Sequence, residues 1–213
     1  MTTTVDYVRA MLGARDPLLD SVLRDAILEH GLRPMQIDDN AARVMQLLTK
    51  LAQPRRAIEI GTYFGYSTIH IARGLPVGGM LTTLEIDDQV AGIARRNLAG
   101  AGVEDRVEIV VGDAAVYLAE VEPESVGLIF IDADKRNYPE YLKLCFPLLE
   151  RGGILVADDA FAHGDFAPEA IDDGMGQAEV RAINTYNRAV LRSAALLSAF
   201  IGTNNGMLVS MKL

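Results

Sequence analysis

Short apolar runs alternate with helical stretches from residue 57 onward. The apolar runs predict five strands, and the stretches between them are long enough to form helices. The predicted strands cover residues 57–61, 80–86, 106–112, 126–132 and 152–158, and the predicted helices between them cover residues 66–73, 88–99, 115–120 and 138–149. Strands that alternate with helices indicate a parallel, doubly wound sheet with right-handed crossovers.

The first 55 residues lack this alternation and predict helices. Asp16 followed by Pro17 is a helix start signal, and Gly31 marks the end of the helix that begins there. A second helix is predicted at residues 38–51. We expect this N-terminal helical extension to pack on the rest of the chain, residues 56–213, within one domain.

The C-terminal part of the chain predicts a change in strand direction. A helix at residues 177–191 precedes two apolar runs, and Asn205-Gly206 lies between these runs. Asn-Gly between apolar runs is a hairpin signal. The predicted fold is therefore α/β: a doubly wound, Rossmann-like, mostly parallel sheet with a C-terminal antiparallel hairpin strand and N-terminal helices.

The net charge, the lengths of the apolar runs and the cysteine count argue against several classes of protein. The chain has 20 Lys plus Arg against 29 Asp plus Glu, a net charge of -9, which argues against nucleic acid as a partner. No apolar run approaches the roughly 20 residues that a membrane helix needs, and no signal peptide is visible. Cys145 is the single cysteine, which is consistent with a reducing compartment. We expect a cytoplasmic protein that does not bind membranes.

Acidic residues stand at or near the end of every predicted parallel strand. They are Glu59, Glu85, Asp113, Asp132 and the pair Asp158-Asp159. In an open parallel sheet, ligands bind beyond the carboxyl ends of the strands. A single acid in such a place is as often a solvated strand end as part of a site, but acids after all five strands favour a site.

The turn after the first strand reads EIGTYFGYS. Gly61 and Gly65 are four residues apart with Tyr63 and Phe64 between them, so the turn is not the dinucleotide fingerprint, and the chain has no phosphate loop. The turn suits a nucleoside without a phosphate chain. Glu85 is placed to accept hydrogen bonds from ribose hydroxyls. A cationic nucleoside such as S-adenosylmethionine fits this acidic edge.

Five stretches, in order and spacing, resemble the cation-dependent class I O-methyltransferases. They are EIGTYFGYS, TLEID, GDA, FIDADKRNY and LVADD, and the resemblance covers about residues 30–213. The family includes catechol and caffeoyl-CoA O-methyltransferases. The resemblance implies transfer of the methyl group of S-adenosylmethionine to a hydroxyl of a small catechol-like phenol. It also implies a bound divalent cation, with Mg²⁺ as the first choice and Ca²⁺ or Mn²⁺ as alternatives.

The resemblance implies roles for the acidic residues and one lysine. Asp132, Asp158 and Asp159 match the family's cation ligands, and oxygen donors suit a hard ion. Lys135 matches the general base, so Lys135 and Asp132 are the candidate catalytic residues. A nearby dication should lower the pKa of the lysine. Most relatives have Asp-Asn at the Asp158-Asp159 pair. The extra carboxylate could raise cation affinity, favour Ca²⁺ or Mn²⁺, or serve the substrate.

The resemblance also implies a set of residues that contact the cofactor. They are Met35, Ile37, Glu59, Gly61, Thr62, Tyr63, Ser67, Glu85, Ile86, Asp113, Ala114 and Asp132. The turn residues match the methionine part of the cofactor, and Glu85 matches the ribose acid. Asp113 and Ala114 match the adenine edge. Met35 and its neighbours match a segment that closes over the cofactor, although packing alone would also explain this methionine.

The substrate and the rival functions can be weighed from the same residues. The predicted loop at residues 160–177 carries four acids and no Lys or Arg, which favours a small phenol over a phosphate-bearing acyl-CoA. His163 in this loop is a candidate for substrate contact. A Rossmann-class NAD(P)-dependent dehydrogenase is disfavoured by the missing glycine fingerprint, and a non-catalytic cofactor-binding module by Lys135 and the acidic triad. Relatives are commonly dimers, so we expect a homodimer.

Overall fold

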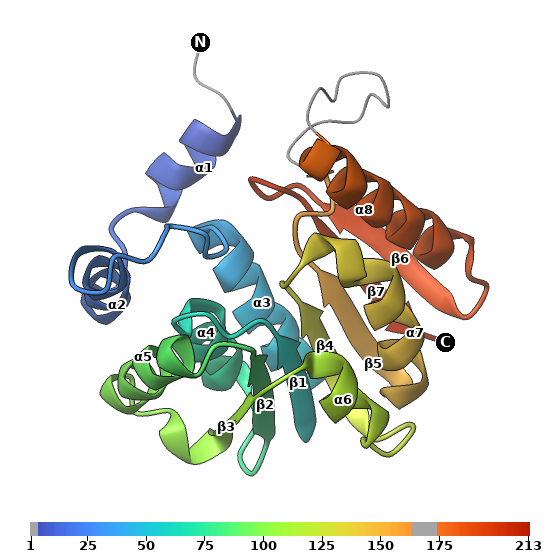
Figure 1. Cartoon of the computed structure of the whole chain (residues 1–213), viewed down its shortest axis with the longest axis horizontal. Helices are drawn as coiled ribbons and strands as arrows, with labels where there is room; N and C mark the ends of the chain where they lie inside the picture. Colours follow the sequence, from blue (N-terminus) through green and yellow to red (C-terminus); the bar gives the residue numbers. More distant parts are fainter. Residues whose placement is uncertain (1–3, 163–173) are drawn as a thin grey trace.

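The chain forms one seven-stranded sheet in a computed structural model that describes residues 4–162 and 174–213 (Figure 1). The strand order is β3-β2-β1-β4-β5-β7-β6. The strands are β1 (Arg56–Ile60), β2 (Met80–Glu85), β3 (Val107–Val111), β4 (Val126–Ile131), β5 (Leu149–Ala157), β6 (Leu196–Ile201) and β7 (Met207–Lys212). β1 to β5 are parallel, whereas β7 runs antiparallel to both β5 and β6. The predicted doubly wound sheet and its antiparallel C-terminal pair are confirmed.

Helices cover both faces of the sheet. They are α1 (Thr4–Leu12), α2 (Pro17–Leu28), α3 (Asp39–Ala52), α4 (Tyr66–Gly74), α5 (Asp88–Gly100), α6 (Ala114–Ala119), α7 (Tyr138–Leu148) and α8 (Gly174–Arg192), with short 3₁₀ turns η1 (Glu104–Arg106) and η2 (Lys135–Asn137). Buried residues of α2 to α5 form one core with the sheet, and those of α6 to α8 form a second core on the opposite face. The first 55 residues are largely helical, as predicted.

The strand β4 shows why the sheet divides two cores. All of its residues are buried, and its sequence, VGLIFI, is a continuous apolar run, as expected for a parallel strand that is covered on both faces. Because side chains alternate along a strand, Leu128 and Phe130 join the core beneath α2 to α5. Ile129 and Ile131 join the core beneath α6 to α8. The carboxyl end of this strand is therefore held rigidly between two packed layers.

Aspartates begin several of the helices by capping their first backbone N–H groups. Asp16 accepts a hydrogen bond from the backbone N–H of Leu18, so the predicted start of α2 is confirmed. Asp38 caps α3, Asp87 caps α5 and Asp113 caps α6 in the same way. None of the helices in the described part of the chain is long and apolar enough to cross a membrane.

Candidate active site

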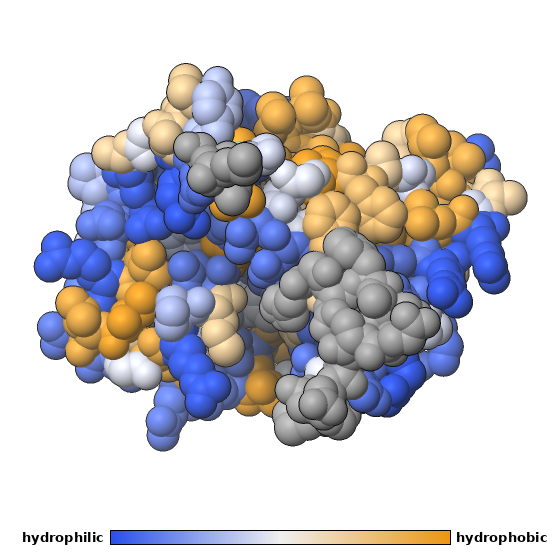
Figure 2. All heavy atoms as spheres, turned by 90° about the horizontal axis from the view of Figure 1, so that it is seen from above, coloured by the Kyte–Doolittle hydropathy of each residue, from blue (hydrophilic) through white to orange (hydrophobic). Residues whose placement is uncertain are grey.

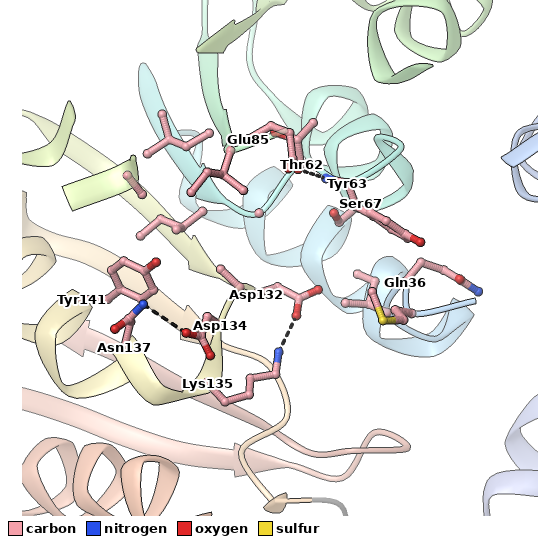
Figure 3. A pocket seen from close by; sticks show the side chains of 18 of the residues that line it. Gln36, Thr62, Tyr63, Ser67, Glu85, Asp132, Asp134, Lys135, Asn137 and Tyr141 are labelled. Carbon is pink, nitrogen blue, oxygen red and sulfur yellow. Dashed lines mark hydrogen bonds and ion pairs between the residues drawn. The ribbon is translucent and has the colours of Figure 1, made fainter. Parts of the chain in front are cut away.

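A cavity of about 620 Å³ lies at the carboxyl ends of the central strands. Its walls come from the turn after β1, the end of β2, the start of α6 and the segment that follows β4 (Figure 3). Its volume is in the range of sites that enclose a cofactor or a drug-sized ligand. Figure 2 looks onto this side of the molecule, where hydrophilic and hydrophobic residues are interspersed.

The turn after β1 is pinned between the two strands that flank it. The backbone N–H groups of Gly61 and Thr62 donate to the carbonyl of Leu84, and that of Asp132 donates to the carbonyl of Ile60. Gly61 has φ +102°, and a Cβ atom there would lie 2.0 Å from the backbone oxygen of Asp132. Only glycine allows this close approach, which brings the β1 turn against the segment after β4.

Two acids on the β2–β3 side of the cavity are engaged by backbone amides. Glu85 accepts hydrogen bonds from the N–H of Tyr63 at 2.7 Å and from the N–H of Asp87 at 3.1 Å. Asp113 accepts from the N–H of Ala115 at 2.8 Å as it caps α6. Both acids line the cavity. Each retains lone pairs that a hydroxyl or amino group of a ligand can use.

Glu59 does not line the cavity, which differs from the predicted contact. It is fully buried, and its Oε2 accepts hydrogen bonds from the hydroxyls of Thr68 at 2.5 Å and Thr83 at 2.6 Å. Burial raises the pKa of Glu59 to about 7, against the opposite effect of nearby hydroxyls. Thr83 in turn meets the hydroxyl of Thr62, at 2.7 Å, and Thr62 does line the cavity. Glu59 therefore reaches the cavity only through other side chains.

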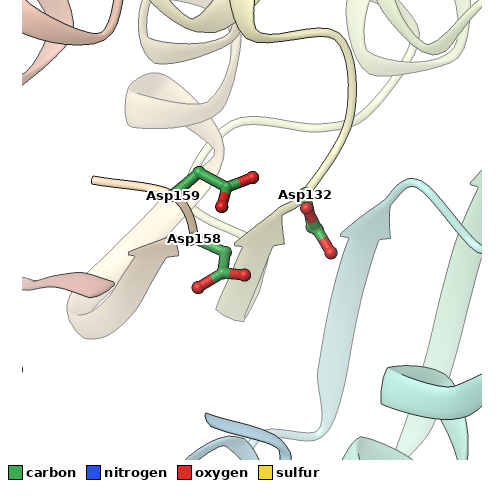
Figure 4. Close-up of side chains that lie close together, drawn as sticks. All are labelled: Asp132, Asp158 and Asp159. Atoms are coloured by element: carbon green, nitrogen blue, oxygen red, sulfur yellow. The ribbon is translucent and has the colours of Figure 1, made fainter. Parts of the chain in front are cut away.

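Three aspartates converge at the ends of β4 and β5 (Figure 4). The two strands are parallel neighbours, and Ile131 lies opposite Ala157. The residues that come next, Asp132 and Asp158, therefore leave the sheet side by side, with Asp159 beyond them. One carboxylate oxygen from each of the three lies within 4.8 Å of the others. The strand register thus produces the cluster that the sequence predicted.

Two carboxylate oxygens of the cluster lack a hydrogen-bond partner within the described part of the chain. Asp158 and Asp159 are buried, and the Oδ1 atom of each has no hydrogen-bond partner among residues 4–162 and 174–213. Burial, followed by repulsion from neighbouring carboxylates, raises the pKa of Asp158. The pKa of Asp132 is also raised, mainly by burial and against the effect of Lys135. Unsatisfied carboxylate oxygens gathered at this spacing fit a hard divalent cation.

Lys135 lies on η2, directly against the aspartates (Figure 3). Its Nζ is 2.9 Å from Asp132 Oδ1 and 2.6 Å from Asp159 Oδ2. Burial opposes its charge, but the oxygens of Tyr138, Asp132 and Asp159 outweigh burial and raise the pKa of Lys135. This direction is opposite to the one expected beside a dication. The chain's own side chains favour an ammonium, so a lowered pKa requires a cation that takes up the carboxylates.

The cavity brings together all of the predicted cofactor contacts except Glu59. The lining includes Met35, Ile37, Gly61, Thr62, Tyr63, Ser67, Glu85, Ile86, Asp113, Ala114 and Asp132. Lys135 and Asp159 also line it, whereas Asp158 does not. Met35 and Ile86 are exposed apolar side chains at its edge. His163 lies outside the described residues.

Several lining residues were not predicted from the sequence. Asn137 and Tyr141 follow Lys135 closely along the chain, so their proximity to the DADK stretch was a usable signal. Tyr66 stands in the β1 turn region, and its hydroxyl donates to Asp39 at 2.5 Å. Glu179 comes from α8, and the packing of α8 against η2 brings it to the cavity. No local pattern marks that last residue.

The strand order, the glycine turn and the acidic cluster define a Rossmann-like methyltransferase class of fold. The O-methyltransferase family model matches residues 12–213. Catechol O-methyltransferase of Niastella koreensis is 34% identical over 85% of this chain and 81% of its own length. Catechol O-methyltransferase of Mycobacterium tuberculosis is 36% identical over 78% of this chain and 75% of its own length. An O-methyltransferase from Bacillus cereus, solved in complex with SAH, has a TM-score of 0.86 at 29% identity and covers 100% of this chain and 98% of its own.

The chain belongs to the O-methyltransferase family. It is an S-adenosylmethionine-dependent O-methyltransferase, which takes a small-molecule acceptor. The family membership implied by the five sequence stretches is confirmed. The family model and the SAH-bound structure favour a methyltransferase over the two alternatives that the sequence left open, a dehydrogenase and a non-catalytic cofactor-binding module.

Proposed function

We propose that the enzyme methylates a hydroxyl of a small catechol-like phenol, and that Asp132, Asp158 and Asp159 hold a divalent cation during the reaction. The convergence of three carboxylates beside Lys135 at the cavity wall carries this proposal. The names of the relatives from Niastella koreensis and Mycobacterium tuberculosis, both catechol O-methyltransferases, support it. Oxygen ligands suit a hard ion. Mg²⁺ is the first choice, because a few carboxylates leave positions for water or substrate oxygens, and Ca²⁺ and Mn²⁺ are the alternatives.

The β1–β3 side of the cavity binds the methyl donor in this proposal. Glu85 accepts hydrogen bonds from the ribose hydroxyls, while Asp113 and Ala114 border the adenine. Met35 and Ile86 cover the base with their exposed apolar side chains. The backbone of Gly61 lets the methionine part pass close to the segment that carries Asp132. These contacts orient the donor so that its methyl group faces the acidic cluster.

The acidic cluster and Lys135 prepare the acceptor. A bound divalent cation supplies Lewis acidity that lowers the pKa of a coordinated phenolic hydroxyl. Lys135 Nζ, in its neutral form, takes the phenolic proton, and the phenolate oxygen then takes the methyl group as the sulfonium becomes a thioether. Asp132 and Asp159, which contact Nζ directly, would ligate the cation, and this would remove the negative charge that favours the ammonium form of Lys135.

We also propose that the enzyme is a cytoplasmic homodimer. Exposed apolar side chains on the N-terminal helices, among them Tyr7, Met11 and Leu28, support a protein contact there. The buried free thiol of Cys145 is typical of a reducing compartment. Light scattering at several protein concentrations tests the dimer, and a monomer at all of them would contradict it.

A methyl-transfer assay tests the proposed reaction. The purified enzyme is incubated with methyl-labelled donor and with catechol, its monophenol counterpart, or a monomethylated catechol. We expect turnover of catechol only, loss of turnover with a chelator, and recovery on addition of Mg²⁺. Turnover that survives exhaustive chelation would contradict the cation, whereas equal turnover of the monophenol would contradict the catechol preference.

A further inference from the structure

A second cavity, of about 320 Å³, lies next to the first. It is enclosed by α1, by the segment at residues 34–40 and by the turn between β6 and β7. Gln36 lines both cavities, and Figure 3 shows this side chain on the far side of Asp132 from Lys135. The two cavities therefore share Gln36 as a common wall residue.

Hydrogen bonds tie the wall of the second cavity to the acidic cluster. The N–H of Asn204, in the β6–β7 turn, donates to Asp38 Oδ2 at 2.9 Å. Further along this turn, the carbonyl of Gly206 accepts from the N–H of Ala160 at 2.9 Å. Ala160 directly follows Asp159. The β6–β7 turn therefore connects the wall of the second cavity to the segment that carries Asp159.

The second cavity has one apolar wall and one polar wall. Val5, Val8 and Leu12 of α1 are half-buried and form the apolar wall. On the polar wall, Gln36 Oε1 and Thr203 Oγ1 are buried without a hydrogen-bond partner in the part of the chain that the structure describes. Thr203 is only 7% exposed. A buried hydroxyl of this kind is normally satisfied, so Thr203 is expected to donate a hydrogen bond to an acceptor group of a ligand.

The charges that line the second cavity are engaged with one exception. Arg15 makes a two-pronged contact with Asp39, at 3.0 and 2.9 Å. Asp38 caps α3 and also accepts from Asn204. Arg9, on α1, has no ion-pair partner within residues 4–162 and 174–213. The wall thus offers one uncommitted positive charge beside an apolar surface.

We infer that the second cavity is an acceptor subsite for a catechol whose side chain ends in a carboxylate. The inference rests on the proposed methylation of catechols and adds the chemistry of the substituent. The carbon chain of the substituent lies against the α1 wall, and its carboxylate pairs with Arg9. The hydroxyl of Thr203 donates a further hydrogen bond to the same carboxylate. An anionic side chain is thereby favoured over a neutral or cationic one of the same length.

Steady-state kinetics with a matched pair of acceptors test this subsite. The pair is 3-(3,4-dihydroxyphenyl)propanoate and its primary amide, which differ in charge but hardly in shape. The wild-type enzyme should favour the acid over the amide in kcat/KM by roughly tenfold, the size expected for one charge-assisted hydrogen bond. Arg9→Gln should remove this preference, and Arg9→Lys should restore part of it. Arg24→Gln, an exposed change on α2, serves as the control and should keep the preference.

The outcomes separate the subsite from the proposed reaction. Equal kcat/KM for acid and amide in the wild-type enzyme, or an unchanged preference in Arg9→Gln, would overturn the subsite while catechol methylation stands. Failure to methylate catechol, acid and amide alike would overturn the proposed reaction and the subsite with it. Calorimetric binding of the acid and the amide to the SAH-loaded enzyme gives a second measurement. It should show the same tenfold difference, and equal affinities would overturn the subsite.

Discussion

The acids on the two halves of the active-site cavity differ in their burial and in their hydrogen-bond partners. On the β2–β3 side, Glu85 and Asp113 accept hydrogen bonds from backbone N–H groups of the turns that they help to form. On the β4–β5 side, Asp158 and Asp159 are buried, and each has a carboxylate oxygen with no partner among the residues described. Their neighbour Lys135 balances only part of the charge.

The difference shows in which half of the cavity the acids find their hydrogen-bond partners within the chain, without a ligand. Acids that cap helices and turns stabilise the chain itself, and they can also accept bonds from a donor molecule. A buried carboxylate oxygen without a partner destabilises the fold, because it has lost its hydration without a replacement. We interpret the β4–β5 half as a site whose energetics depend on a bound cation. The following predictions test this comparison.

Replacement of Lys135 by methionine should have the largest effect. Methionine keeps much of the side-chain length but cannot accept a proton, so kcat should fall by roughly 10³-fold. SAH affinity, measured by calorimetry, should stay near the wild-type value, because Lys135 borders the β4–β5 half. Lys143→Met, on the exposed side of α7, is the matched control. Full turnover in Lys135→Met would show that the lysine is not the base.

Glu59 is a buried carboxyl group outside the cluster of three aspartates. Its Oε2 accepts hydrogen bonds from two threonine hydroxyls, and its Oε1 has no partner among residues 4–162 and 174–213. Its pKa is raised from 4.5 to about 7, so between these pH values the folded chain keeps a proton that the unfolded chain releases. Stability from Glu59 is therefore present at low pH and is lost as the pH rises to 7, by about 3 kcal/mol. The unfolding free energy of the wild type minus that of Glu59→Gln should therefore fall by this amount between pH 4.5 and 7.

Denaturant titrations from pH 4.5 to 8 measure this difference in unfolding free energy, with the exposed Glu108→Gln as control. A pH-independent difference would contradict the buried proton.

The substitution Asp159→Asn removes one charge from the acidic cluster with little change in shape. Fewer ligand charges weaken the binding of a divalent cation, so Mg²⁺ affinity should fall by about tenfold. Calorimetric titration of the SAH-loaded protein measures this. Asp113→Asn makes the same chemical change on the other half of the cavity and should keep Mg²⁺ affinity. If both variants bind Mg²⁺ equally well, Asp159 is not a ligand, and the alternative in which it serves the substrate gains support.

The substitution Glu85→Gln should have the smallest effect. It should change the affinity for SAH and not the affinity for Mg²⁺. Glutamine keeps one acceptor oxygen but loses the charge, so SAH affinity should fall by about fivefold, or about 1 kcal/mol. Mg²⁺ affinity should not change, because Glu85 lies on the β2–β3 half. A change in Mg²⁺ affinity together with SAH affinity would remove the distinction between the two halves.

Much of the fold followed from local pattern, and the errors have physical causes. The strands predicted at residues 80–86 and 126–132 agree with β2 and β4 to within one residue. The fifth strand begins earlier than predicted, at Leu149, because that residue pairs with Val126 of β4. Such pairing depends on a neighbour that is distant in sequence. Hairpin chemistry at Asn205-Gly206, by contrast, is local and was predicted.

The position of Glu59 outside the cavity lining has a specific explanation. Alternation along β1 puts Glu59 on the same face as Ala57, which packs in the core beneath α2 to α5. Its side chain therefore meets Thr68 of α4. Strand alternation was a usable signal, but the family resemblance pointed to the cofactor instead. Glu179 had no signal, because only the packing of α8 against η2 brings it to the cavity.

The sequence by itself determined the order of strands and helices, and it placed an acid at or near the end of each parallel strand. These features depend on local periodicity and on turn residues, which a single chain displays directly. Only the tertiary structure decided which acids accept hydrogen bonds from backbone N–H groups and which keep a buried carboxylate oxygen without a partner among the described residues. Hydrogen bonding and burial depend on neighbours from distant parts of the chain. The pairing of β4 with β5 therefore makes a cluster of Asp132, Asp158 and Asp159, while Glu85 and Asp113 remain part of their own turns.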